Sequence, residues 1–270
     1  MAAEDSNQLE KQGKLIAVCS AKGGIGKTLI SVNLALAFKK KNLDVTLVDG
    51  DFQFGDVCLA LDLKPTFSIK DVIEEIDGIS EDTIMNYTTN HLSSVKVLAA
   101  PDRPEYAELV SSEAVTIVID ALLKQNDYVI VDNGTGIQEQ SMDILDKADE
   151  ILIVTNLEMT ALKNTKLLLE AFTQINMREK VQLVVNRYNM ESLLKADEVS
   201  KMLGEANSFF IPNNFKIASQ SMNLGIPFVS NQAKCDLSKA IFKMTESIIS
   251  KQAIKPKEKK SFLHKILPRK

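Results

Sequence analysis

The amino-acid sequence predicts an α/β fold, a doubly wound and mostly parallel sheet with helices on both faces. Short runs of β-branched and aliphatic residues alternate with longer stretches of helical period, which is the order expected of consecutive βαβ units. The chain has 270 residues, of which 45% are hydrophobic, and this is enough for one large core. We therefore expect a globular body at 14–252, a flexible tail at 1–13 and a basic segment at 253–270.

The aliphatic runs are bounded by turn residues, so each one is expected to form a single buried strand. In order along the chain, these strands are expected at 14–19, 44–48, 95–99, 128–131, 151–155, 181–186 and 208–211. Helical periodicity between them predicts helices at 27–41, 68–77, 112–125, 138–147, 160–176, 195–203 and 236–252. The apolar runs are far shorter than the roughly 20 residues that span a bilayer. Because Met1 to Gly13 also lacks an apolar signal segment, we expect a cytoplasmic protein.

The charge of the chain is unevenly distributed. The net charge is −4, yet residues 251–270 carry eight Lys or Arg side chains and a single acidic residue, Glu258. A basic end on an acidic body is typical of proteins whose partner is an anionic membrane or a nucleic acid.

Cysteine and histidine are too sparse to suggest a metal cage. Cys19, Cys58 and Cys235 are isolated, and His91 and His264 are far apart. No cysteine pair has the spacing needed for an iron–sulfur cluster, which disfavours a reductase of related fold. We expect reduced structural thiols and no metal beyond one that accompanies a nucleotide.

A glycine-rich loop directly follows the first expected strand and opens the first expected helix. It consists of Lys22, Gly23, Gly24, Ile25, Gly26, Lys27 and Thr28. Glycines let successive backbone N–H groups turn toward a phosphate, and the helix N-terminus adds the positive end of its dipole. Lys27 would contact the β- and γ-phosphates, and the Thr28 hydroxyl would ligate Mg²⁺. The sequence therefore predicts a site for ATP with Mg²⁺.

The loop resembles the deviant Walker A loop of the MinD/ParA family of ATPases, because Ala21 stands at its first position and Lys22 follows. The resemblance implies a homodimer with ATP, in which Lys22 reaches the partner's nucleotide. It also implies slow hydrolysis that an unidentified protein partner stimulates. A solvated surface lysine is the alternative for Lys22. Leu29 stands where relatives carry Ser or Thr, so a hydroxyl contact to the α-phosphate is not expected.

Acidic residues follow two expected strands, Asp49 and Asp51 after 44–48 and Asp132 after 128–131. Ligands of an open parallel sheet lie at these carboxyl ends. The resemblance assigns Asp51 to orienting the attacking water, Asp49 to the outer shell of Mg²⁺ and Asp132 to holding Mg²⁺ through water. The loop 133–136, Asn-Gly-Thr-Gly, departs from the Pro-containing loop of relatives, so its mechanics are open.

The resemblance also places the adenine near the end of the strand at 181–186. Asn186 and Arg187 would lie beside the base and Pro212 would pack along its other side. The alternative for Asn186 and Arg187 is the start of a turn.

Within the family, 51–57, 98–104 and 162–165 look most like the CpaE/TadZ group, which helps to place pilus-assembly machinery. The end of the chain is instead similar to the membrane-targeting helix of MinD. Four apolar residues there share one helical face, with basic residues around them: Phe262, Leu263, Ile266 and Leu267. The alternatives are a tail that docks on its own domain or only solubilises the chain end.

The sequence is compatible with three functions. The first is an ATPase that associates peripherally with the inner face of the cell membrane and positions cellular machinery. The second is a ParA-like DNA-partition ATPase, which the acidic body makes less favourable. The third is a nucleotide-bound localisation scaffold with little turnover, for which Leu29 and the unusual loop 133–136 argue.

Overall fold

The computed structural model describes residues 13–254, except 193 and 205–207. The membrane-targeting residues expected at Phe262, Leu263, Ile266 and Leu267 lie outside the described residues, as do 1–12. None of the helices in this described part is long and apolar enough to cross a membrane.

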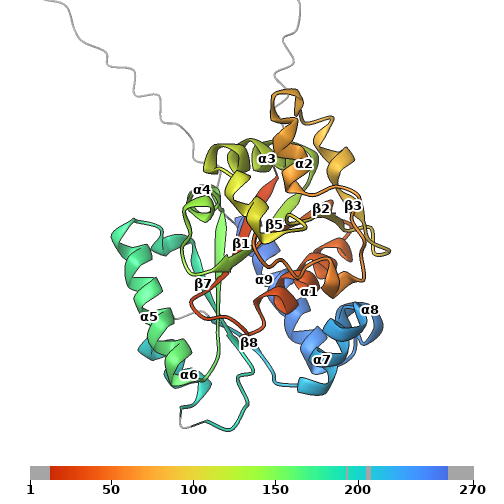
Figure 1. Ribbon diagram of the computed structural model, residues 1–270. Helices are drawn as coiled ribbons and strands as arrows, with labels where there is room; N and C mark the ends of the chain where they lie inside the picture. The colour runs from red at the N-terminus through yellow and green to blue at the C-terminus, as the bar shows by residue number, and fades with distance from the viewer. Residues whose placement is uncertain (1–12, 193, 205–207, 255–270) are drawn as a thin grey trace, which may run out of the picture.

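A sheet with the strand order β3-β4-β2-β5-β1-β6-β7-β8 forms the centre of the molecule (Figure 1). Its strands are β1 Lys14–Ser20, β2 Val45–Gly50, β3 Thr89–Asn90, β4 Lys96–Leu98, β5 Tyr128–Thr135, β6 Glu150–Thr155, β7 Val181–Asn186 and β8 Ser208–Ile211. All pairings are parallel apart from the short antiparallel pair of β3 with β4. The predicted doubly wound fold is confirmed.

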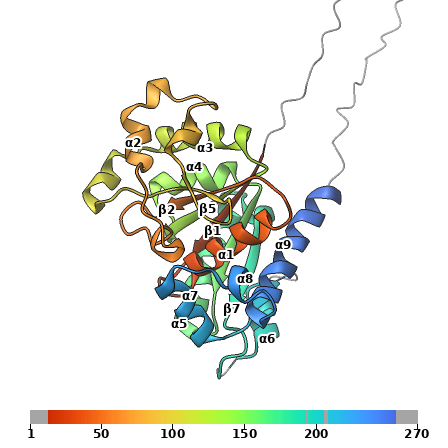
Figure 2. The same ribbon diagram turned by 90° about the vertical axis from the view of Figure 1, so that its right-hand side faces the viewer.

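Helices cover both faces of the sheet (Figures 1 and 2). They are α1 Lys27–Lys39, α2 Ile69–Glu74, α3 Ser112–Gln125, α4 Glu139–Lys147, α5 Met159–Gln174, α6 Ala196–Met202, α7 Phe215–Leu224, α8 Phe228–Asn231 and α9 Asp236–Ile254. Alternate residues of β1 enter opposite cores. Leu15, Ala17 and Cys19 pack with α2 to α5, whereas Ile16 and Val18 pack with α1, α8 and α9. This period of two is what a strand buried on both sides requires.

All seven predicted strands and all seven predicted helices are present, with ends that shift by a few residues. Among the α-helices and strands of the described residues, β3, α7 and α8 were not predicted. The sequence does signal α7, because the Asn214 side chain accepts a hydrogen bond from Ile217 N at 3.1 Å and caps the helix start. Gly225 closes the helix at φ 63, where a Cβ would lie 2.5 Å from Asp62 N.

Candidate functional site

The glycine loop lies at the carboxyl end of β1, and its backbone requires glycine at two points. Gly24 and Gly26 have φ values of 74 and 92, which side-chain-bearing residues rarely adopt. At Gly26 a Cβ would also lie 2.5 Å from Asn186 Nδ2. The same amide donates to Ile25 O at 2.7 Å, so β7 holds the loop from below.

Behind the loop, one buried carboxylate gathers a cation and two hydroxyls. Asp132 Oδ1 lies 3.0 Å from Lys27 Nζ and 2.7 Å from Ser31 Oγ, and Asp132 Oδ2 lies 2.7 Å from Thr28 Oγ1. Asp132 is 1% exposed and Lys27 is 8% exposed. We call these four residues the inner cluster. Sequence reasoning found three of them and missed Ser31, although its position one helical turn after Lys27 places it on the same face of α1.

Asp49 stands beside Asp132 in the register of β2 and β5, but its carboxylate is used differently. It accepts hydrogen bonds from Asp51 N at 3.3 Å and from Val57 N at 3.0 Å. Burial, together with the nearby Asp132 charge, raises the pKa of Asp49 to about 8. Asp49 therefore ties down the segment that follows β2, and its role toward Mg²⁺ stays a prediction.

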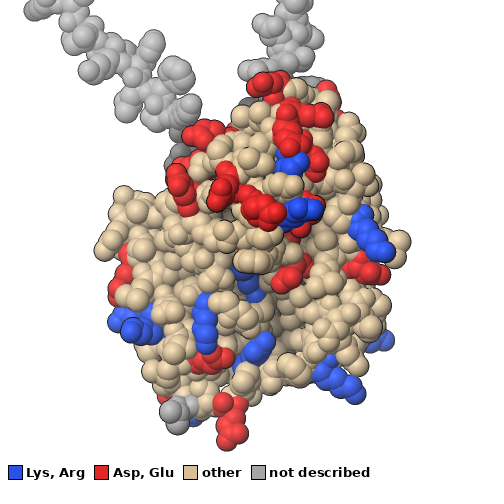
Figure 3. Space-filling view, viewed as in Figure 1, with Lys and Arg blue, Asp and Glu red and all other residues tan. Residues whose placement is uncertain are grey.

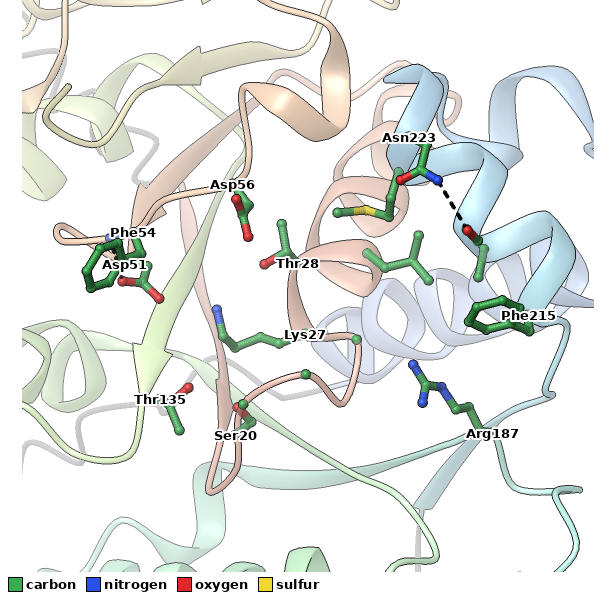
Figure 4. A pocket seen from close by; sticks show the side chains of 17 residues that line it. Ser20, Lys27, Thr28, Asp51, Phe54, Asp56, Thr135, Arg187, Phe215 and Asn223 are labelled. Atoms are coloured by element: carbon green, nitrogen blue, oxygen red, sulfur yellow. Dashed lines mark hydrogen bonds between the residues drawn. The ribbon is translucent and has the colours of Figure 1, made fainter. Parts of the chain in front are cut away.

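A pocket of about 500 Å³ opens in front of the loop (Figure 4). At the end beside the glycine loop, Lys27 and Thr28 face Asp51, Phe54 and Asp56 from the segment after β2. Asp51 is half-buried, and its Oδ1 accepts a hydrogen bond from Phe54 N at 3.2 Å. The predicted Asp51 therefore lines the same pocket as Lys27.

The other end of the pocket is formed by α7 and Arg187. Arg187, Phe215 and Asn223 lie at this end (Figure 4), and Ser219 and Leu29 also line the pocket. Asn186 is buried and engaged with Ile25, and among the described residues Pro212 does not line the pocket. Contact of Asn186 and Pro212 with a base therefore stays a prediction. Sequence reasoning missed Phe215, Ser219 and Asn223 because it missed α7.

Lys22 points away from this pocket. Its Nζ forms an ion pair with Glu158 at the start of α5 and lies 3.1 Å from Thr160 Oγ1. Asn156 Nδ2 donates to the same carboxylate at 3.0 Å. The Lys22 ammonium holds the pKa of Glu158 below its usual value. Within one chain, Lys22 is thus held by α5 at the outer side of the loop.

The loop 133–136 is more regular than expected, because β5 continues through Thr135. The Asn133 amide is buried and donates to Cys19 Sγ at 3.4 Å, while Gly136 N donates to Ser20 O at 2.8 Å. Thr135 is exposed and lines the pocket opposite Gly23. Burial raises the pKa of Cys19 to about 12, so this thiol stays neutral.

Comparison with known proteins adds a family. The family model described as an AAA domain matches residues 13–185. The septum site-determining protein MinD of Helicobacter pylori is 26% identical over 251 residues, which cover 88% of this chain and 91% of that protein. Among solved structures, a ParA family ATPase from Chlorobium tepidum superposes with a TM-score of 0.82 at 24% identity, covering 87% of this chain and 98% of its own. MinD of Pyrococcus horikoshii, solved with Mg-ADP, gives a TM-score of 0.77 at 23% identity, with coverages of 91% and 99%.

Proposed function

This chain belongs to the AAA domain family, and from that premise we propose that it is a MinD/ParA-type ATPase that binds Mg-ATP and uses it to control homodimerisation. The observation that carries the proposal is the inner cluster. It brings the loop lysine and the loop threonine to Asp132 of β5. MinD and ParA proteins recur among the relatives, and one of the similar structures was solved with Mg-ADP.

The oxygens near Lys27 suit a magnesium ion. Thr28 Oγ1 and the Asp132 carboxylate are hard oxygen donors, which Mg²⁺ prefers, and Asp132 would act through water. When bound, Mg²⁺ would neutralise charge on the phosphates. Gly23, Gly24, Ile25 and Gly26 would surround the β-phosphate with backbone N–H groups, and Lys27 would bridge toward the γ-phosphate.

Hydrolysis would depend on positioning, because phosphoryl transfer needs little covalent chemistry from the protein. Asp51 would orient the attacking water from across the pocket. Lys22 would leave Glu158 and stabilise charge on the nucleotide of the twin subunit.

Oligomeric state is the direct test of this proposal. We expect calorimetry to detect ATP binding only with an intact Lys27, and analytical ultracentrifugation to find dimers with ATP and monomers with ADP. Lys39→Ala, which removes a lysine whose side chain is 23% exposed from the same helix, is the matched control. No binding of either nucleotide in the presence of Mg²⁺ would overturn the proposal.

Peripheral association with an anionic membrane is the further part of this proposal, and the basic end of the chain supports it. Two amphipathic tails held together by a dimer would bind a membrane far more strongly than one. The protein would then cycle between the cytoplasm and the inner face of the cell membrane and position division-site or pilus-assembly machinery. Co-sedimentation with anionic liposomes tests this, since binding should require ATP and be lost on deletion of 256–270.

Each of two alternative functions is favoured by a specific observation. Similarity to a ParA family structure favours a DNA-partition ATPase, for which strong salt dependence of DNA binding would be the evidence. Leu29 on the pocket wall and the regular strand through Thr135 favour a scaffold with little turnover. Measuring turnover with and without lipid separates the scaffold from the ATPase.

A further inference from the structure

A second hollow, of about 490 Å³, lies on the other side of the segment that follows β2. It is nearly as large as the nucleotide pocket. Its walls come from the segment after β2, from α2 with the residues that lead into it, and from the loop after β4. Two separate stretches of the sequence, 51–57 and 98–104, both contribute to it, through Gly55 and through Ala99 to Asp102. The nucleotide pocket uses the first stretch only in part and the second not at all.

One strip of chain separates the two hollows. Asp51, Phe54 and Asp56 face the nucleotide pocket, whereas Asp49, Gly55 and Cys58 face the second hollow. The strip is therefore a partition with one face toward each space. A ligand on either side contacts the same backbone.

The partition is packed tightly against the floor of the second hollow. A Cβ at Gly55 would lie 2.4 Å from Asp49 Oδ2 and 2.6 Å from Ala100 Cβ, so the backbone at Gly55 has no room for a side chain. Asp49 in turn accepts hydrogen bonds from the backbone of residues 51 and 57, at the two ends of the strip. A shift of the floor must therefore move the strip that carries Asp51.

The walls of the second hollow combine aromatic rings with acidic groups. Phe67 and Tyr106 supply the rings. Lys70 lies 5.2 Å from the centre of the Tyr106 ring, but its charge is offset by Glu74 at 2.7 Å. Asp71 accepts hydrogen bonds from Ser68, and Asp49 at the floor is buried and accepts hydrogen bonds from the backbone. The exposed Asp102 at the rim is therefore the carboxylate that remains open to a cation.

The surroundings of the hollow strengthen its acidic character. Residues 65–110 carry nine acidic side chains and three basic ones. Acidic side chains gather over this part of the molecule in Figure 3, around α2 and α3. Such a field attracts cations and disfavours phosphates or other anions.

We propose that the second hollow is a docking site for an arginine side chain of a basic protein segment, and that its occupancy is felt by the nucleotide pocket through the 51–57 partition. A planar guanidinium stacks on aromatic rings and binds a carboxylate with two hydrogen bonds, so it fits walls made of Phe67, Tyr106 and Asp102. The effect on the nucleotide depends on the function proposed above, whereas the binding itself does not.

Nuclear magnetic resonance of the ¹⁵N-labelled full chain tests the binding. Arginine amide is titrated into the protein without nucleotide, and citrulline amide, a neutral analogue of nearly the same shape, is the matched probe. We expect saturable shifts at Gly55, Ala99, Ala100 and Asp102 with arginine amide only. Asp102→Asn should weaken binding about fivefold, as expected for one exposed ion pair.

Equal shifts with both probes, or shifts confined to other surfaces, would overturn the docking site.

Coupling between the two hollows is tested separately, by measuring ATP affinity and turnover while arginine amide saturates the second hollow. We expect at least a twofold change in one of them, and none in a Tyr106→Leu, Asp102→Asn double variant. If arginine amide binds and ATP does not, the docking site stands and the proposed ATPase falls. If ATP binds and arginine amide does not, the reverse holds.

Discussion

The phosphate loop has an inner and an outer side, and its two lysines are held there in different ways. On the inner side, Lys27 is buried and lies 3.0 Å from a carboxylate that is itself 1% exposed. On the outer side, Lys22 is more than one third exposed, and its partner Glu158 is exposed as well. The inner side is held by buried contacts. The outer side is held by a surface contact that costs little to break.

The largest effect on stability and on ATP affinity should come from removing the ion pair between Lys27 and Asp132. Lys27→Ala leaves the Asp132 charge buried without its ammonium, so the free energy of unfolding should fall by about 3 kcal/mol and ATP affinity at least about 100-fold. Urea denaturation and calorimetry measure the two quantities. Lys39→Ala removes a lysine at the same 3.0 Å distance from an exposed acid, Asp44, and should cost under about 1 kcal/mol. Similar losses in the two variants would erase the contrast between the sides.

Asp51 tests whether the pocket wall facing the loop serves hydrolysis rather than binding. Asp51→Asn should lower the turnover number about 100-fold while ATP affinity changes less than about threefold, because orientation of water matters only in the reaction. Phosphate release and calorimetry give these values. Asp56→Asn alters a neighbouring carboxylate on the same wall and should leave turnover within about threefold of the original. An equal loss for Asp56→Asn would argue for a general charge effect.

A third prediction concerns pH and the acid beside the inner cluster. The pKa of Asp49 is about 8 in the folded protein and near 4 in the unfolded chain, so the folded state binds this proton more tightly. Its stabilising contribution is complete below about pH 4 and is lost as pH rises through about 8, with a slope of at most about 1.4 kcal/mol per pH unit. Asp49→Asn should flatten this decline. Urea denaturation between pH 5 and 8 checks it, and identical pH profiles would contradict it.

The smallest effect should come from the outer side. Glu158→Gln removes the ion pair that holds Lys22 within its own chain, so ATP-dependent dimerisation should strengthen about two- to fivefold. Analytical ultracentrifugation of the ATP-bound protein measures the dissociation constant. Glu246→Gln breaks a surface pair of similar exposure with Lys41, far along the chain, and should leave dimerisation unchanged. Weaker dimerisation of Glu158→Gln would mean that Glu158 itself serves the interface.

The sequence was most informative where a pattern repeats or a motif is local. Short aliphatic runs and helical period located fourteen elements. The glycines of the loop 22–28 predicted a phosphate-binding turn, and two of them have positive φ in the structure. Lys27 and Asp132 were both predicted as site residues, since parallel strands end at one edge of the sheet, but the ion pair between them was not predicted.

Contacts between segments that are distant in the sequence follow no spacing rule, so the sequence did not predict them. The ion pair of Lys22 with Glu158 spans 136 positions, and the amide of Asn186 reaches the loop across 161. β3 has two residues, too few for any periodicity. α7 is a different case, because Asn214 and Gly225 are recognisable capping residues and could have revealed it.

The strand order predicts which parts of the sheet unfold first. β5 and β1, which bear Asp132 and the glycine loop, are interior strands flanked by β2 and β6, while β3 and β8 lie at the margins. Local opening of the edge strands breaks few backbone hydrogen bonds, so the amides of β3 and β8 should exchange with deuterated water early. The amides of β1 and β5 should exchange only on global unfolding. A tightly bound ligand would then slow deuteration throughout the sheet and not only where it touches.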